Sequence, residues 1–163
     1  MSDERLGLNA QRTKSGRIVS LRPAMPGDVM LLYHWQIHPN TRQYARNPRP
    51  PTLAEHCEWF HKHLGSADCI LMIILLDDAP AGCLRLDRLF EARSPAWEVS
   101  INIAPEYLRL GLATAALSLA RSAMPGTELV AHVLPRNTAS HALFRAAGFR
   151  HGSDGNYHLV CAG

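Results

Sequence analysis

The chain has 163 residues, of which 47% are hydrophobic, and a formal net charge of +3 from 17 basic and 14 acidic side chains. This length suits one domain, and the small charge gives no reason to expect nucleic acid as a partner, although it suits an anionic small ligand. Without a run of about 18 apolar residues we expect no membrane partner, and four cysteines without CxxC spacing suggest reduced thiols in a cytoplasmic protein.

The chain divides into a polar leader and one domain. Residues 1–16 show no hydrophobic periodicity, so we expect a flexible N-terminal leader, with residues 17–163 forming a single domain. A strand is predicted over residues 17–23. Thr52 and Glu55 have capping-box spacing, which predicts the start of a helix. Together with apolar periodicity, this indicates helices over residues 29–37, 41–45 and 52–65.

The middle and the end of the chain alternate strands with helices. Residues 69–76 form a continuous apolar run, typical of a central strand, and a turn leads into an alternating strand over residues 81–89. Further strands are predicted at 96–103, 128–134, 149–151 and 156–160. Helices are predicted at 110–121 and 137–148. Without an internal repeat or a dividing linker, this order predicts one mixed α+β domain.

The turn between residues 103 and 112 has the features of a phosphate site. The first amides of a helix have no intrahelical partner and lie at the positive end of the helix dipole. Gly111 lets a ligand approach this backbone closely, Ala113 adds little bulk, and Arg109 adds a cation. Taken alone, the same residues also fit an ordinary packing turn.

Two motifs resemble those of the GCN5-related N-acetyltransferase (GNAT) family. Motif A of that family reads Arg/Gln-x-x-Gly-x-Gly/Ala after a strand; Gly111 and Ala113 match it, and Leu108 stands at its first position. The stretch Asn137-x-x-Ser140-x-x-Leu143-Phe144-x-x-x-Gly148-Phe149 is similar to motif B. The resemblance covers residues 17 to about 160 and implies the GNAT fold, a mixed and mostly antiparallel sheet of about seven strands flanked by about four helices.

The resemblance implies acetyl-CoA as the co-substrate, with no metal. In the family, the strand before motif A pairs with the pantetheine arm, and the motif A amides hold the pyrophosphate. Carried onto this sequence, the coenzyme-binding residues are Ile101, Asn102, Ile103, Leu108, Arg109, Leu110, Gly111, Leu112, Ala113, Thr114, Asn137 and Phe144.

Acetyl transfer to an amine also needs a base and a proton donor. Glu98 stands where family members often supply a glutamate base; His132 is the alternative because histidine titrates near neutrality, and both also fit structural roles. Many members carry a tyrosine where this chain has Phe144, so we rank Ser140 first as the proton donor, with Tyr157 or water as alternatives. Because neither motif contains a cysteine, direct attack in a ternary complex is favoured over an acyl-cysteine.

The acceptor is predicted from the helices before the first hairpin. This region resembles the branch of the family that acetylates nucleotide-linked amino sugars, and the residues that match are Trp35, Arg42, His56 and Trp59. Core packing also explains both tryptophans. The runner-up acceptor is a protein N-terminus, because the same helices resemble ribosomal-protein alanine N-acetyltransferases. An alternative of another class is a catalytically silent module that senses acyl-CoA, which the phenylalanine at position 144 keeps open.

One histidine-rich helix invites a metal interpretation. It contains His56, Cys57, His61 and His63, but no second ligand group follows at zinc spacing, so no metal is predicted. Solvated histidines near a helix end, which favour the helix dipole, are the simpler explanation. The expected partners are therefore acetyl-CoA and a small amine, and the sequence is compatible with a homodimer without specifying one.

Overall fold

The computed structural model describes residues 10–163. Within them the strands are β1 (Gln11–Arg12), β2 (Ile18–Pro23), β3 (Cys69–Leu76), β4 (Ala79–Leu89), β5 (Ala96–Ile103), β6 (Glu128–Ala131), β7 (Arg150–His151) and β8 (Tyr157–Val160). The helices are α1 (Val29–Ile37), α2 (Pro39–Arg42), α3 (Leu53–His63), α4 (Leu112–Ala123) and α5 (Thr138–Ala146). Two short 3₁₀ turns, Pro26–Asp28 and Pro105–Tyr107, precede α1 and α4.

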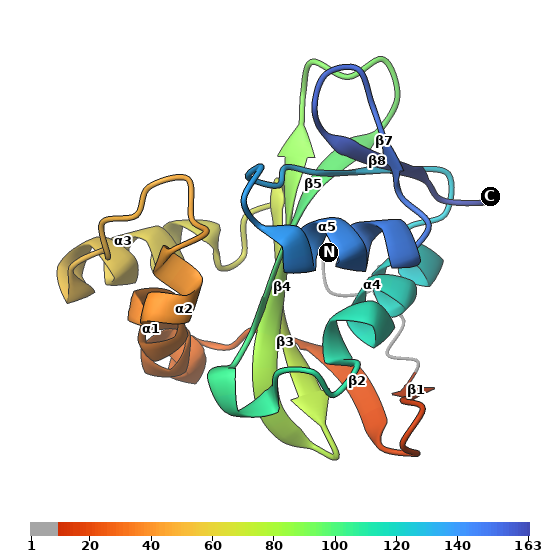
Figure 1. Cartoon of the computed structure of the whole chain (residues 1–163). Helices are drawn as coiled ribbons and strands as arrows, with labels where there is room; N and C mark the ends of the chain where they lie inside the picture. Colours follow the sequence, from red (N-terminus) through yellow and green to blue (C-terminus); the bar gives the residue numbers. More distant parts are fainter. Residues whose placement is uncertain (1–9) are drawn as a thin grey trace.

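All eight strands belong to one sheet in the order β1-β2-β3-β4-β5-β6-β8-β7. Every neighbouring pair is antiparallel except β5 and β6, which are parallel. Helices α4 and α5 lie on one side of the sheet, and α1, α2 and α3 lie on the other (Figure 1). The predicted α+β class and GNAT fold are confirmed, with slightly more elements than expected: eight strands against about seven, and five α-helices against about four, within the described residues.

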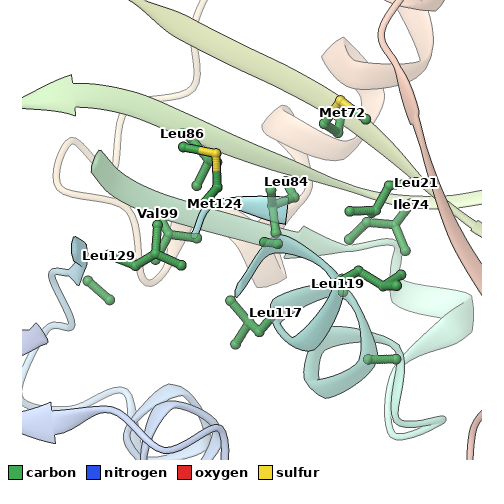
Figure 2. Close-up of a cluster of buried hydrophobic side chains, with 14 of the residues drawn as sticks. Leu21, Met72, Ile74, Leu84, Leu86, Val99, Leu117, Leu119, Met124 and Leu129 are labelled. Atoms are coloured by element: carbon green, nitrogen blue, oxygen red, sulfur yellow. The ribbon is translucent and has the colours of Figure 1, made fainter. Parts of the chain in front are cut away.

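The larger core lies between the sheet and α4. Figure 2 shows Leu117 and Leu119 of α4 beside apolar side chains of the strands, among them Ile74, Leu84 and Val99. The helix buries the stripe expected from its spacing, namely Leu112, Ala115, Ala116, Leu119 and Ala120. This burial fixes the N-terminal turn of α4 against the sheet.

The second core lies under α1 and α3, on the other face of the sheet. Phe60 of α3 is fully buried there with Leu32, Leu71 and Ile73. A side chain of this kind contributes about 1.5 to 3 kcal/mol when it is fully buried. Because side chains alternate along a strand, β4 and β5 present polar groups on this same face. They include Arg85, Glu98, Ser100 and Asn102.

Local sequence signals explain two of the connections. Asp77 and Asp78 both have positive φ, 47° and 68°, and form the two-residue turn of the predicted β3–β4 hairpin. The predicted capping box at the start of α3 is confirmed, because the Thr52 hydroxyl accepts from the Glu55 amide and the Glu55 carboxylate accepts from the Thr52 amide.

Some boundaries differ from the sequence-based expectation. Gln11 and Arg12 pair with β2, so the predicted flexible leader is wrong for this part, while residues 1–9 lie outside the described residues. Helix α2 begins at Pro39 rather than near residue 41, because the His38 side chain caps it and proline suits the first helical position. Strand β6 ends at Ala131 instead of residue 134.

A buried ion pair fixes where α1 begins. Arg22 of β2 donates two hydrogen bonds to the Asp28 carboxylate, at 2.7 and 2.9 Å, and the Met25 amide donates a third at 2.8 Å. These bonds, led by the one from Arg22, hold the pKa of Asp28 below its usual value. The carboxylate therefore stabilises the fold while it is charged.

We expect Asp28→Asn to destabilise the protein at pH 7 by about 1 to 3 kcal/mol, the usual contribution of a hydrogen bond to a charged group. Because the folded-state pKa is lowered, this contribution is fully present above the unfolded-state pKa of about 3.9. It is lost as the pH falls through the lower folded-state value. Urea unfolding of both proteins between pH 7 and pH 3 measures the difference in unfolding free energy. A difference that stayed constant over this range would contradict the prediction.

Candidate active site

The loop before α4 has the geometry of an anion site. Arg109 and Gly111 both have positive φ, 63° and 80°. Gly111 is the N-cap of α4 and has no side chain to cap the helix, so the amides of Leu112, Ala113 and Thr114 have no hydrogen-bond partner within residues 10–163. A Cβ added to Gly111 would meet no atom within 4 Å, so the space beside this glycine is open.

This loop brings the predicted motif A residues together, but they contribute differently. The side chains of Leu108, Arg109 and Leu110 are exposed around the open amides. Leu112 is 1% exposed, so its side chain packs in the core and only its amide faces the loop. A phosphate placed here would meet backbone donors, the helix dipole and one arginine.

The parallel pairing of β5 with β6 ends early. It joins residues 96–98 to residues 128–130, whereas β5 continues to Ile103 and β6 ends at Ala131. Beyond Glu98, the edge of β5 that faces β6 therefore has no strand partner in the described part of the chain. The alternate N–H and C=O groups of Ile101, Asn102 and Ile103 that point to this edge are open to an extended ligand.

Helix α5 supplies the predicted motif B residues. The Asn137 side chain accepts a hydrogen bond from the Ser140 amide and so caps the helix. The Ser140 hydroxyl has no hydrogen-bond partner among residues 10–163, which leaves it able to donate. Phe144 is 4% exposed and packs against Phe149 and Tyr157. Its ring therefore has a packing role in the core, and its contact with the coenzyme stays a prediction.

Tyr157 is not available as the alternative proton donor. It is fully buried, and its hydroxyl lies 2.7 Å from Nδ1 of His141. The carbonyl of Leu134 can only accept, so Nε2 of His141 donates to it and Nδ1 accepts from Tyr157. The phenol thus holds the segment after β6 rather than a reacting group.

Glu98 and His132 occupy different surroundings. The Glu98 carboxylate is 23% exposed and lies 2.8 Å from Nη2 of Arg46, which comes from the segment after α2. Two residues along β5, Ser100 contacts Arg85 weakly at 3.5 Å. His132 lies just beyond the end of β6, is exposed, and contacts Asn156 at 3.1 Å.

A cavity of about 400 Å³ lies between the α2–α3 segment and β4. Three of the four predicted acceptor residues line it: Arg42, His56 and Trp59. The fourth, Trp35, does not line it: its side chain is 6% exposed and packs with Leu32 and Phe60 in the second core, and its contact with an acceptor stays a prediction. The remaining lining residues are Gln36, Asn47, Arg49, Pro51, Glu55 and Arg85.

His56 forms part of the cavity wall as a neutral ring. Burial lowers its pKa, and its Nε2 donates to the Val29 carbonyl at 2.9 Å. His61 and His63 bond the carbonyls of Cys57 and Trp59 in the preceding turn, each at 2.7 Å. Within residues 10–163, no group of three or more His, Cys, Asp or Glu side chains could hold a metal ion.

Three further residues near the site were not predicted from the sequence: Arg46, Arg49 and Arg85. Arg85 occupies a polar position in the alternating pattern of β4. The sequence alone therefore places it on the polar face of that strand. Arg46 and Arg49 lie in the proline-rich segment, where no periodicity indicates which side chains turn inward. Only the folded structure places Arg46 on Glu98.

Comparisons with known proteins agree with this geometry. The family model of an acetyltransferase (GNAT) domain matches residues 19–150. This match spans well over half of the chain, so the chain belongs to the GNAT family. It is an N-acetyltransferase that uses acetyl-CoA, as the motifs predicted. A search among curated proteins finds no match.

Solved structures share the fold at low sequence identity. The GNAT domain of S. lividans PAT has a TM-score of 0.72 at 20% identity, with 93% of this chain and 94% of that chain covered. Spermidine N-acetyltransferase from Vibrio cholerae, in complex with CoA and spermine, has a TM-score of 0.75 at 18% identity, covering 88% and 95%. Mycobacterium smegmatis RimJ, in complex with CoA-disulfide, has a TM-score of 0.76 at 18% identity, covering 93% and 86%.

No helix within residues 10–163 combines the length and the apolar character that a membrane crossing requires.

We expect Gly111→Ala to weaken coenzyme A binding about tenfold, because an L-residue costs about 1 to 2 kcal/mol in the left-handed conformation and the loop relaxes to avoid it. Isothermal titration with coenzyme A measures the change. Gly126→Ala is the matched control, since Gly126 also has positive φ, 72°, and open space at its Cβ position. Equal losses of affinity in both variants would contradict a coenzyme role for this loop.

Proposed function

We propose that this enzyme transfers the acetyl group of acetyl-CoA to the primary amine of a nucleotide-linked amino sugar, by direct attack in a ternary complex. The observation that carries the proposal is the position of the cavity beside Arg85 of β4, on the side of the sheet that the polar residues of β5 also face. Glu98 lies on that face of β5, and the open edge of the same strand begins just beyond it. The same strand, β5, would thus lie beside both the coenzyme and the acceptor amine.

The residues around the open edge suit the coenzyme. Acetyl-CoA supplies the activated acetyl group. The free amides of α4 and the side chain of Arg109 would hold its pyrophosphate, and the edge of Ile101 to Ile103 would align its extended arm. The structures of the V. cholerae and M. smegmatis proteins contain CoA or CoA-disulfide, which supports this assignment.

Two side chains of this chain would move protons. Glu98 is the proposed base, because its carboxylate faces the side of the sheet where the cavity lies. The free hydroxyl of Ser140 is the proposed donor on the leaving side. Direct attack is supported by the cysteines: burial raises the pKa of Cys69 to about 12 and that of Cys83 to about 11, which disfavours a thiolate nucleophile.

The alternative acceptor is a protein N-terminus. It is supported by the likeness of the acceptor helices to ribosomal-protein alanine N-acetyltransferases, and M. smegmatis RimJ shares the fold. All four cysteines are free thiols, which supports the proposed cytoplasmic location.

We expect acetyl-CoA to release its thiol rapidly with a UDP-linked amino sugar and slowly with a peptide or spermidine. Thiol release in the presence of each amine, measured with a chromogenic disulfide, tests this. Fast turnover of the peptide would establish the alternative acceptor. Tight binding of coenzyme A without turnover of any amine would contradict the proposed function and favour the sensor.

We expect Glu98→Gln to lower kcat by about 10² to 10⁴-fold near neutral pH, the usual contribution of a general base. The residual activity should rise with pH, because more of the acceptor amine is then neutral. His132→Asn, which removes the exposed ring, should leave kcat unchanged, and both variants should bind coenzyme A normally. The opposite result for the two variants would make His132 the base.

A further inference from the structure

The acceptor cavity has an excess of cations. Three of its nine lining residues are arginines: Arg42, Arg49 and Arg85. Its single carboxylate, Glu55, lies 3.1 Å from Arg49 and neutralises it, and Asp87 behind the cavity lies 2.7 Å from Arg85. Arg42 has no carboxylate partner within residues 10–163, so its charge is not balanced by the protein that surrounds it.

Arg42 is held in place by neutral groups alone. Its guanidinium donates to Oε1 of Gln36 at 2.9 Å and to the carbonyls of Asn47 and Arg49 at 3.0 and 3.3 Å. Its Nε is buried and has no hydrogen-bond partner. Burial lowers the pKa of Arg42, which means that the site disfavours the charge it carries. A partly buried cation without a counter-ion gains stability when a ligand supplies one.

A second buried donor without a partner lies at the same corner. Nδ2 of Asn102 makes no hydrogen bond, and its Oδ1 accepts from the hydroxyl of Thr41, the residue before Arg42. These two are the only buried side-chain nitrogen or oxygen atoms without a partner in the described residues. Both are N–H donors, so this part of the protein has more donors than acceptors.

The Trp59 ring helps to hold Arg85 in position. The Arg85 guanidinium lies over the Trp59 ring, 5.4 Å from its centroid, and the His63 ring stacks on the same indole at 4.9 Å. A stacked guanidinium keeps its N–H groups directed at an anion in a fixed plane. Trp59 can thus act on the acceptor through the arginine that it holds, besides lining the cavity itself.

We propose that Arg42 and Arg85 bind an oxyanion on the acceptor, a phosphate or a carboxylate, and that this anion selects the substrate. The inference rests on the proposed function and narrows its acceptor to amines that carry negative charge. Guanidinium groups match phosphate and carboxylate oxygens in pairs, which gives both affinity and orientation. A polyamine, which carries only positive charge, is repelled by the same residues.

Binding is tested with coenzyme A at saturation, so that the coenzyme site is filled. Inorganic pyrophosphate and UDP probe phosphate recognition, succinate probes carboxylate recognition, and spermidine is the cationic control. We expect saturable calorimetric binding of at least one anion, weakened at least about tenfold by Arg42→Gln and by Arg85→Gln. Whichever anion binds identifies the source of the charge. If none binds, or if neither variant matters, the inference is wrong.

Two further variants and one kinetic measurement separate this inference from the proposed function. Arg88→Gln is the matched control on the opposite face of β4, and it should bind anions normally. Arg42→Lys keeps the charge and should retain more affinity than Arg42→Gln, while normal coenzyme A binding verifies that each variant is folded.

In turnover, Arg42→Gln and Arg85→Gln should raise KM for the acceptor much more than they lower kcat. Anion binding without turnover would refute the proposed function alone. Turnover restricted to uncharged or cationic amines would refute the inference alone.

Discussion

The early end of the parallel pairing between β5 and β6 is the constraint on which the site depends. Three residue pairs join the two strands, and β5 then continues for five residues to Ile103, paired with β4 alone. Unpaired backbone at a sheet edge is normally covered or avoided. Here the edge runs toward the open amides of α4, so the backbone groups that the sheet leaves unpaired and those that the helix leaves uncapped lie along one path.

The two faces of β5 differ: one packs in the larger core, and the other presents polar side chains. Trp97, Val99, Ile101 and Ile103 point toward α4 and the larger core, and this burial fixes the strand. The alternate residues point toward α1, α2 and α3 and need not pack tightly, so they can be polar. The strand can therefore present Glu98, Ser100 and Asn102 on its polar face, and leave part of its edge unpaired, without weakening the core.

The sequence contained the signals for the coenzyme side because those signals are local. A glycine that must adopt positive φ and an asparagine that caps a helix are both recognisable within a few residues, and both lie where the sequence predicted them. The acceptor side was less predictable, because its key contacts join distant segments. Arg46 reaches Glu98, and Arg85 reaches Trp59. Large aromatic residues were ambiguous for another reason: Trp35 and Phe144 suit a core as well as a ligand, and the fold placed both in the core.

The segment after α2 connects the acceptor to the proposed base. It contains Arg46, which pairs with Glu98, and Arg49, and Arg42 at the end of α2 bonds two carbonyls of this segment. An anion that binds Arg42 contacts the residue that anchors this segment, and so affects the position of Arg46. Arg46 is 61% exposed, so moving it costs little burial, whereas Glu98 is fixed on the sheet. Under the proposals above, Arg42 would therefore couple selection of the acceptor to the segment that covers the carboxylate of the proposed base.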